Sequence, residues 1–534
     1  MSPIISLSPL EILLTELERL DIKLWVEGDK LRFDAPPGAL TAEVRARLQT
    51  SKPELIRFLD EAKVYAPGEG YPFLSEQERV GIHPLSFAQR HFGLMQIRYP
   101  EECFYNVPFG FRISGPLDVV ALQNSLNALC MRHDFLRTTL NTFNDEVRQI
   151  VAPRGKIPVH PVDLRHVPSA EHPSHIQREV LAECHLPFDL SCDCSVRVRL
   201  LTLADQEHIL LLCLHNTAFD TGSLRALLHE IECHYQAFTD REPKLSLPEL
   251  PMQYAGCVRW QQALLAGDLE SRLIYWRDWF TRGEPPPLTW AIAGRQTPSG
   301  TYAAGTLWCE LSAELTLAIK QLSLEQNVTV FITLVSAYAL VLSRYSGYTD
   351  VVLGTTLANR NHWKLEPIIG SLLNILALRF DLAAEMTFVH LLQQTRSIVM
   401  DAFAHQDIPF GVMAPAILPG TERTTPLFRT VFSFLGELTQ DELKLAGATV
   451  CFMEEIHGES MFPDLYPTVW ERQTPDGLAL TSCWQYKRGY MPEHTVARMT
   501  EDFKVILTAM VTHPTHTLSS VNFPDNDNKL THND

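Results

Sequence analysis

The sequence predicts a fold of the α/β class, because apolar runs of strand length alternate along it with helical patterns. The run 209–214 contains no polar residue, which predicts a strand buried on both faces. An amphipathic helix follows from about Gly222. Residues 328–342 are apolar all round and predict a buried helix, and residues 351–355 predict a second buried strand. The apolar stripe of the amphipathic helix, at helical spacing, comprises Leu224, Leu227, Leu228, Ile231 and Tyr235.

The first 63 residues have the sequence signals of a small separate unit, in a chain whose 534 residues are enough for two or three domains. Ser8-Pro-Leu-Glu11 is a capping box, which predicts a first helix. Alternating apolar residues on either side of a turn predict a β-hairpin over residues 22–33. Two short helices are expected after the break at Pro36-Pro-Gly38. The predicted order of elements is αββαα.

Polar residues gather where the first buried strand gives way to the amphipathic helix. His215, Asn216, Asp220 and Ser223 lie in this junction. Thr221 and Ser223 are the expected caps of the helix, because short hydroxyl side chains can accept hydrogen bonds from its first N–H groups. Loops held by rigid elements are common positions for chemistry, so the junction is the candidate site.

The composition limits the classes of function. Hydrophobic residues make up 46% of the chain, and a net charge of -18 argues against a nucleic-acid-binding surface. No apolar run reaches the roughly 18 residues that a membrane span needs, and the N-terminus lacks the pattern of a secretion signal. The eleven cysteines form no CxxC pair, and Cys192-Asp-Cys194 has no second pair to complete a metal site. We therefore expect a cytoplasmic protein with reduced thiols and no metal.

The segment from His215 to Ser223 resembles the HHxxxDGxS signature of nonribosomal peptide synthetase condensation domains. The core of this signature, HHxxxDG, is shared with the chloramphenicol acetyltransferase superfamily. The first His, the Asp and the Ser are present as His215, Asp220 and Ser223. The second His is replaced by Asn216, and the Gly by Thr221. The resemblance implies that His215 is a structural residue and that Asn216 occupies the position of the general base.

Other segments resemble condensation-domain elements and follow one another in the family's order. The resemblance implies two chloramphenicol acetyltransferase-like lobes in a V, with a tunnel between them. After a linker at 64–82, it places an N-terminal lobe at 83–262, a C-terminal lobe at 263–525 and a polar tail at 526–534. The segments and the family patterns are Leu85-Ser-Phe-Ala-Gln-Arg90 (SxAQxR), Arg132-His-Asp-Phe-Leu-Arg-Thr138 (RHExLRT), Tyr254-Ala-Gly-Cys-Val-Arg-Trp260 (YxDYAxW), Ile369-Gly-Ser-Leu-Leu-Asn374 (IGxFVN), His405-Gln-Asp-Ile-Pro-Phe410 (HQDxPF) and Pro426-Leu-Phe428.

The resemblance also implies roles for residues outside the signature. A buried carboxylate needs a charged or hydrogen-bond-donating partner, and in the family the signature Asp belongs to a structural ion pair. We therefore expect Arg137 to be the ion-pair partner of Asp220. Gln89, Asn374 and Gln406 are expected to be scaffold or lobe-interface residues along the tunnel.

The first unit, residues 1–63, resembles the TubC-type N-terminal docking domains found at the start of some synthetase chains. The resemblance rests on the hairpin sequence Leu24-Trp-Val-Glu-Gly-Asp-Lys-Leu-Arg-Phe33, on Ala35-Pro36 and on Gly38-Ala-Leu-Thr41. It implies dimerisation and, by strand addition, capture of the C-terminal tail of the preceding synthetase chain. A free hairpin edge is physically suited to that role.

Four residues of the hairpin are expected to contribute to docking. Trp25 and Phe33 supply apolar surface, whereas Lys30 and Arg32 alternate along one strand and favour an acidic tail. The predicted partners are thus an upstream synthetase chain and, through the same unit, a second copy of this protein.

The resemblance implies that the chain joins an acyl or peptidyl thioester on one carrier protein to an amine on another. The two phosphopantetheine arms then belong to the donor and acceptor carriers, and no bound cofactor is expected. An asparagine can accept a hydrogen bond or stabilise charge, but Asn216 cannot carry a proton away. His215 is the alternative base within the signature.

Three functions remain open at this point. The domain can still form the bond, with Asn216 only orienting an amine that arrives deprotonated. It can have lost catalysis and serve as a docking platform inside a synthetase. It can also be a stand-alone acyltransferase for a soluble amine, alcohol or acyl-CoA, although such an enzyme needs no docking unit. The sequence does not identify the acyl donor or the acceptor. It also leaves open whether the product is an amide or an ester, and whether the protein is free-standing or cut from a larger assembly line.

Overall fold

A computed structural model describes most of the chain, and it divides the chain into two compact units. One comprises Met1–Phe73 and Arg360–Pro367, and the other comprises Leu74–Asn359 and Ile368–Asp534. The described residues are 23–27, 30–34, 40–53, 55–56, 76–103, 105–144, 146–240, 247–266, 269–280, 283, 286, 288, 303–360, 363–417, 427–437, 443–453, 456, 463–475 and 477–523.

The smaller unit contains the predicted hairpin. Its two strands are antiparallel, with Trp25 opposite Arg32. Helix α2 begins after Thr41, whose side chain accepts a hydrogen bond from the Val44 N–H (3.2 Å). The predicted first helix, which starts at the Ser8 capping box, lies outside the described residues. The elements are β1 (Lys23–Glu27), β2 (Lys30–Asp34), α2 (Ala42–Thr50) and, in the segment 360–367, the 3₁₀ turn η4 (Trp363–Leu365).

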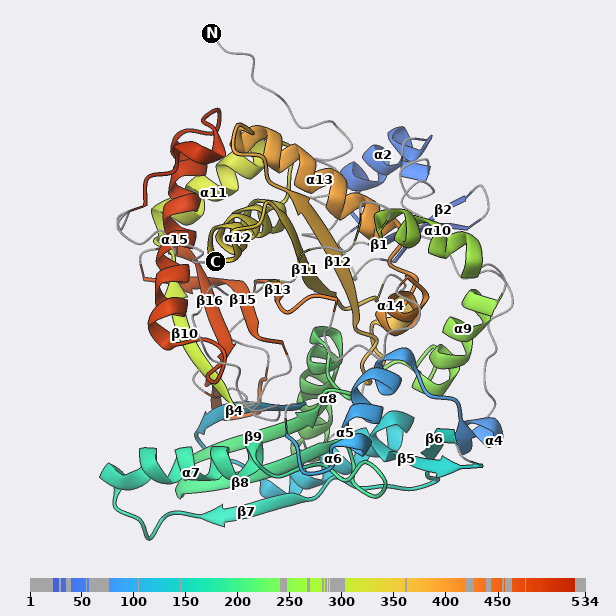
Figure 1. Ribbon diagram of the computed structural model, residues 1–534. Coiled ribbons are helices and arrows are strands. Elements are labelled where there is room, and N and C mark those ends of the chain that lie inside the picture. Colours follow the sequence, from blue (N-terminus) through green and yellow to red (C-terminus); the bar gives the residue numbers. More distant parts are fainter. Residues whose placement is uncertain are drawn as a thin grey trace. The chain divides into compact units, whose positions relative to one another are not determined.

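The larger unit contains a six-stranded mixed sheet with helices packed on it (Figure 1). The strand order is β10-β16-β15-β13-β11-β12, and only the pairs β11–β13 and β13–β15 are parallel. The buried strand predicted at 351–355 lies within β11. The strands are β10 (Ala304–Glu310), β11 (Asp350–Leu357), β12 (Asn374–Asp381), β13 (Val431–Glu437), β15 (Leu465–Thr474) and β16 (Gly477–Lys487). The helices are α11 (Ala313–Glu325), α12 (Val330–Ser346), α13 (Phe388–Ala404) and α15 (Glu493–Thr512).

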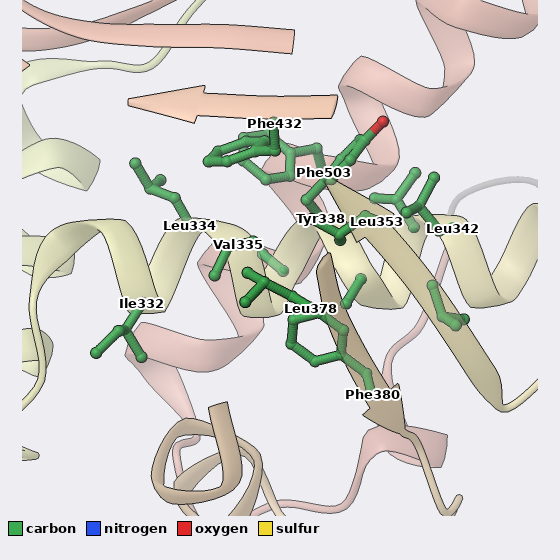
Figure 2. Close-up of a cluster of buried hydrophobic side chains, with 14 of the residues drawn as sticks. Ile332, Leu334, Val335, Tyr338, Leu342, Leu353, Leu378, Phe380, Phe432 and Phe503 are labelled. Atoms are coloured by element: carbon green, nitrogen blue, oxygen red, sulfur yellow. The ribbon is translucent and has the colours of Figure 1, made fainter. Parts of the chain in front are cut away.

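Helix α12 is the buried helix that the sequence predicts at 328–342. It starts after Thr329, which caps the Ile332 N–H, and ends at Gly347, whose positive φ of 75° suits a residue without a Cβ. Figure 2 shows apolar side chains of this helix in one cluster with those of β11, β12 and β13 and with Phe503 of α15. Tyr338 is fully buried, and its hydroxyl hydrogen-bonds Thr430. This packing fixes the sheet whose strand β12 begins at Asn374.

A second sheet of five strands carries the candidate site. Its order is β14-β4-β9-β8-β7, with only β7 and β8 parallel. β9 is buried at every position after Glu207, because strands flank it on both sides and side chains cover both faces. This confirms the strand predicted at 209–214. The strands are β4 (Asn106–Ser114), β7 (Val159–Asp163), β8 (Val196–Ala204), β9 (Glu207–His215) and β14 (Thr449–Phe452).

The amphipathic helix predicted after this strand is α8 (Thr221–Thr239). The predicted caps at Thr221 and Ser223 are wrong. Asp220 is the N-cap, and its side chain accepts the Ser223 N–H at 2.7 Å. The extended backbone of Asp220 (φ -143°, ψ 171°) places its carboxylate over the first turn, which is where unsatisfied N–H groups lie.

The remaining helices and strands complete the larger unit. No single helix of the described chain is long and apolar enough to cross a membrane; α11 and α12 pass that test only as a pair bent by 106°. Residue 262, the predicted lobe limit, lies inside α9, and the domain limits remain predictions. The elements are α4 (Glu76–Arg79), β3 (Gly81–His83), the π-helix η1 (Gln89–Gly93), α5 (Leu94–Arg98), α6 (Val119–Arg132), η2 (Asp134–Arg137), β5 (Thr138–Phe143), β6 (Glu146–Val151), η3 (Ser169–Glu171), α7 (His172–Cys184), α9 (Tyr254–Ala266), α10 (Leu269–Phe280), α14 (Phe410–Ile417) and η5 (Leu518–Ser520).

Candidate active site

His215 is the last residue of β9, and its side chain is completely buried. Its Nδ1 accepts the Thr217 N–H at 3.2 Å and lies 2.9 Å from the Thr217 hydroxyl. Since Nδ1 accepts a backbone N–H, the ring hydrogen is on Nε2. Burial, and secondarily the charge of Arg197, lower the pKa of His215 to about 3. The ring is therefore neutral at pH 7 and is held as part of the scaffold.

Asn216 follows directly and is only half-buried. Its backbone N–H donates to the Tyr105 carbonyl at 2.9 Å, which fixes the main chain at this position. The side-chain amide makes no hydrogen bond to any residue that the structure describes. His215 is thus buried and bonded within the fold, whereas the side-chain amide of half-buried Asn216 is available to a ligand.

Asp220 and Ser223 join α8 to the segment 370–372. The Asp220 carboxylate accepts the Ser223 N–H at 2.7 Å and the Leu372 N–H at 2.9 Å. The Ser223 hydroxyl donates to the Gly370 carbonyl at 3.1 Å. All three bonds are buried, so the signature and the Ile369–Asn374 motif form one connected structure.

Gly370 is required at this contact for two reasons. Its φ of +129° is a conformation that other residues rarely adopt, and a Cβ there would lie 2.4 Å from the Tyr254 ring. The Tyr254 hydroxyl donates to the Ser371 carbonyl at 2.7 Å, and the Ser371 N–H donates to the Thr217 carbonyl at 2.8 Å. The loop after His215 is therefore held by the same segment that receives Asp220.

Arg137 is not the partner of Asp220, which corrects the expected ion pair. Its guanidinium bonds the Asp134 carboxylate at 2.5 Å and the Ala152 carbonyl at 2.8 Å, with longer contacts to the carbonyls of Cys130 and Met131. A buried carboxylate needs hydrogen-bond donors, and at Asp220 backbone N–H groups supply them in place of the expected arginine. Arg137 instead holds the turn between α6 and β5.

Gln89, Asn374 and Gln406 occupy different surroundings. The Gln89 side chain accepts the Ser86 N–H at 2.8 Å and donates to the Gln149 side chain at 3.2 Å, all buried. The Asn374 amide donates to the carbonyls of Gln406 and Ile408, at 2.8 and 3.0 Å. Gln406 thus contributes its backbone to this contact. The predicted residues therefore have different partners: Asn374 follows the segment that bonds Asp220 and Ser223, whereas Arg137 bonds Asp134 and Ala152.

Two small adjoining pockets lie beside the segment 371–375. Sequence reasoning did not identify His91 as one of the lining residues. The signal was present, because the last position of SxAQxR, counted from Ser86, falls on His91 rather than Arg90. Burial lowers the pKa of His91 to about 4. The lining residues are Phe87, Ala88, His91, Phe92, Gln261, Asn359, Ser371, Leu372, Leu373, Asn374, Ile375, Pro409, Phe410 and Gly411.

The hairpin of the smaller unit exposes the predicted docking residues that the structure describes. Lys30, Arg32 and Phe33 are exposed, with Phe33 at 49%. The backbone of Trp25 lies in β1, and its side chain is outside the described residues. In the described part of the chain, β1 and β2 pair only with each other, so each has one outer edge.

Comparison with known proteins identifies both units. Residues 80–530 match the family model described as the condensation domain. The chain belongs to the condensation-domain family. Residues 11–61 match the TubC N-terminal docking domain. A linear gramicidin synthase from Brevibacillus parabrevis is 36% identical over 440 residues, which are 81% of this chain and 8% of that protein. Malpinin synthetase from Mortierella alpina is 33% identical over 431 residues, which are 80% of this chain and 5% of that protein. The condensation-domain chain therefore spans less than a tenth of the length of these two relatives.

Solved structures share the fold of this condensation domain. The complex of the X-domain and OxyB from teicoplanin biosynthesis matches with a TM-score of 0.71 and 24% identity, covering 85% of this chain and 99% of that chain. The first condensation domain of the calcium-dependent antibiotic synthetase, in complex with a substrate analogue, matches with a TM-score of 0.68 and 18% identity. That match covers 83% of this chain and 100% of the other. The α/β fold class and the chloramphenicol acetyltransferase-like architecture are thus confirmed.

Proposed function

We propose that this condensation domain joins an acyl or peptidyl thioester on a donor carrier protein to an amine on an acceptor carrier, forming an amide. The observation that carries the proposal is the state of Asn216. It is a half-buried amide without a hydrogen bond to the described residues, in a loop held by the Thr217–Ser371 contact. Ser371 in turn lines one of the two pockets. A ligand amine or oxyanion next to this loop would find an unoccupied hydrogen-bonding group.

The proposed roles of the signature residues follow from their contacts. His215 keeps the loop in place, because its proton is on Nε2 and its Nδ1 is already an acceptor. Asn216 orients the amine or stabilises developing negative charge. Much of the acceleration then comes from bringing two carrier-borne reactants together in a fixed orientation.

The test combines the purified chain, an acyl-loaded donor carrier and an amine-loaded acceptor carrier. Intact mass should show product on the acceptor with the wild type. Asn216→Ala removes one neutral hydrogen bond, so we expect its initial rate to fall by about threefold to tenfold. Asn141→Ala removes an amide of β5 whose hydrogen bonds go to Thr139 and to the Ser191 carbonyl, and it should match the wild type.

Each contrary outcome has its own meaning. If neither the wild type nor Asn216→His forms product, the result contradicts catalysis, and the docking platform is the function that remains. Product in Asn216→His alone would show that the natural chain is a disabled enzyme. Turnover of a free amine without any carrier would assign the chain to stand-alone acyltransferases.

The platform is the second candidate, and a specific observation favours it. Neither His215, with a pKa of about 3, nor Asn216 can take a proton from an amine at pH 7. The X-domain, which shares the fold, is known in a complex with OxyB. For this chain the platform means binding neighbouring synthetase parts without transferring the acyl group.

We also propose that the hairpin of the smaller unit binds, through strand addition, the acidic C-terminal tail of an upstream synthetase chain. Exposed Lys30 and Arg32, with the outer edges of β1 and β2, support this. A peptide copying that tail should bind more weakly as salt rises, because exposed charges are screened. We expect Lys30→Glu/Arg32→Glu to weaken binding by about tenfold in isothermal titration calorimetry.

A charge-matched control is available on the same unit. Arg45→Glu/Lys52→Glu makes the same charge change at two exposed positions in and after α2. It should keep nearly the affinity of the wild type. Binding that is independent of salt, or equal losses in the two double variants, would show that the charges of the hairpin do not select the tail.

A further inference from the structure

Two consecutive peptide groups hold the loop of the signature from a distant part of the chain. The carbonyl of the first group, that of Gly370, accepts the Ser223 hydroxyl at 3.1 Å. The N–H of the same group, that of Ser371, donates to the Thr217 carbonyl at 2.8 Å. Thr217 directly follows Asn216. Since a peptide group is planar, the orientation of this plane helps to set where Asn216 lies.

The second peptide group is also bonded on both sides. Its N–H, that of Leu372, donates to the Asp220 carboxylate at 2.9 Å. Its carbonyl, that of Ser371, accepts the Tyr254 hydroxyl at 2.7 Å. Tyr254 and Asp220 therefore hold opposite sides of one plane, which meets the first plane at the Cα of Ser371. Of these two side chains, only that of Tyr254 comes from outside the signature.

The side chain of Tyr254, the first residue of α9, is fixed by its surroundings. Its ring is buried, packs edge-on against Phe135 with 4.8 Å between the ring centroids, and lies so close to Gly370 that no Cβ would fit there. Gln253, the residue before it, accepts the Asp134 N–H at 2.9 Å and so attaches the start of α9 to η2. The hydroxyl of Tyr254 is therefore presented to the segment 370–372 at one defined position.

The hydrogen bonds of this hydroxyl have a single direction. It donates its one hydrogen to the Ser371 carbonyl, so it accepts the hydrogen of the Ser86 hydroxyl, 2.7 Å away. Ser86 is held by a capping box, because its hydroxyl accepts the Gln89 N–H at 2.9 Å and its own N–H donates to the Gln89 side chain at 2.8 Å. A buried chain of hydrogen bonds thus runs from Ser86 through Tyr254 to the segment that holds the signature.

We propose that Tyr254 is a positioning residue of the condensation reaction, which keeps Asn216 in place through Ser371 and Thr217. This inference rests on the proposed condensation activity and adds to it a residue that acts through another. Without the hydroxyl, the buried Ser371 carbonyl loses its side-chain donor, and its peptide group can turn about the bonds on either side. The Asn216 amide then lies less often in the orientation that suits the reaction. The loss falls on kcat, whereas the binding of the carriers is unaffected.

The test uses Tyr254→Phe, which keeps the ring and removes only the hydroxyl. In amide formation between loaded carriers, kcat should fall by about threefold to tenfold, as expected for Asn216→Ala, with an unchanged KM for the acceptor carrier. In the Asn216→Ala background, Tyr254→Phe should lower kcat by less than about twofold, because the group that it positions is already absent.

Tyr338→Phe is the matched control. It removes the hydroxyl of another fully buried tyrosine, which hydrogen-bonds Thr430 in place of the segment 370–372. It should keep the kcat of the wild type. Thermal melting of the two Phe variants shows that both are folded at the assay temperature, so that a loss of kcat confined to Tyr254→Phe does not arise from unfolding.

The failures of the two proposals are distinguishable. An active wild type with an unchanged kcat in Tyr254→Phe would overturn the role of Tyr254 and leave the condensation activity standing. Equal losses in Tyr254→Phe and Tyr338→Phe, a loss confined to KM, or a full further loss in the Asn216→Ala background would also overturn the inference. A wild type that forms no product would remove the condensation activity itself and the inference with it.

Discussion

Replacing Asp220 with alanine is expected to lower the free energy of unfolding by about 2–5 kcal/mol. The Asp220 carboxylate is buried and accepts two backbone N–H groups, those of Ser223 and Leu372, at 2.7 and 2.9 Å. Alanine would leave both donors buried without an acceptor, and it would remove the N-cap of α8. Urea unfolding, followed by tryptophan fluorescence, measures the change.

Two variants separate the reasons for that loss. Asp220→Asn keeps one acceptor oxygen but turns an N–H₂ group toward the other donor, so it should lose a substantial part of the same free energy. Asp118→Ala removes an N-cap carboxylate that also accepts two N–H groups, those of Val120 and Ala121, at an exposed site. It should cost only about 1 kcal/mol, because water can replace the lost acceptor. Equal losses for Asp220→Ala and Asp118→Ala would contradict the argument from burial.

Local patterns were sufficient to predict the elements that carry the site. The apolar run 209–214 and the stripe that follows it correspond to β9 and α8, and the apolar segment 328–342 corresponds to α12. Each of these predictions depends on residues within a few positions of one another. The same holds for the hairpin of the smaller unit, whose alternation and turn are local. The spacing of apolar residues along the sequence directly indicates whether a helix or strand is buried on one face or on all faces.

The contacts of the signature were less predictable, because they join distant parts of the chain. Asp220 is bonded to Leu372, 152 positions later, through a backbone N–H that every residue except proline possesses. No residue type marks such a partner, and the expectation of a charged side chain led to Arg137. The cap was misassigned for a related reason: Asp220, Thr221 and Ser223 can all cap a helix, and only the backbone geometry distinguishes them.

His91 illustrates a different limit. Within Phe87–Gly93 a single histidine in a helical, largely apolar stretch is ordinarily a core residue. Its position in the pocket depends on the π-helix, which changes the direction of the side chains, and on Gly93, where a Cβ would lie only 2.5 Å from Leu140 Cδ1. The π-helix has no sequence signal of its own, and the signal at His91 is the register of SxAQxR counted from Ser86.

The stability of the larger unit should fall as the pH drops from 6.5 toward 3, partly because of His215. The pKa of His215 is about 3 in the fold and 6.5 in a model environment, so between these values the unfolded chain binds a proton that the folded chain does not. The contribution of neutral His215 to the free energy of unfolding is therefore fully present above pH 6.5 and is lost as the pH falls toward 3. One such group contributes at most about 1.4 kcal/mol per pH unit over this range.

His215→Asn isolates this contribution, because its Oδ1 can accept the Thr217 N–H in place of Nδ1. The variant should be less stable than the wild type at pH 7, since a smaller side chain leaves a cavity beside Phe188 and Tyr105. Its free energy of unfolding should nevertheless change less steeply between pH 6.5 and 3. His91, which also has a lowered pKa, is present in both proteins and cancels in the difference. Urea unfolding at several pH values provides both slopes, with His160→Asn on exposed β7 as the control for losing one imidazole. Parallel slopes for wild type and His215→Asn would mean that His215 takes up its proton in the fold, and its assignment as a neutral scaffold residue would then be wrong.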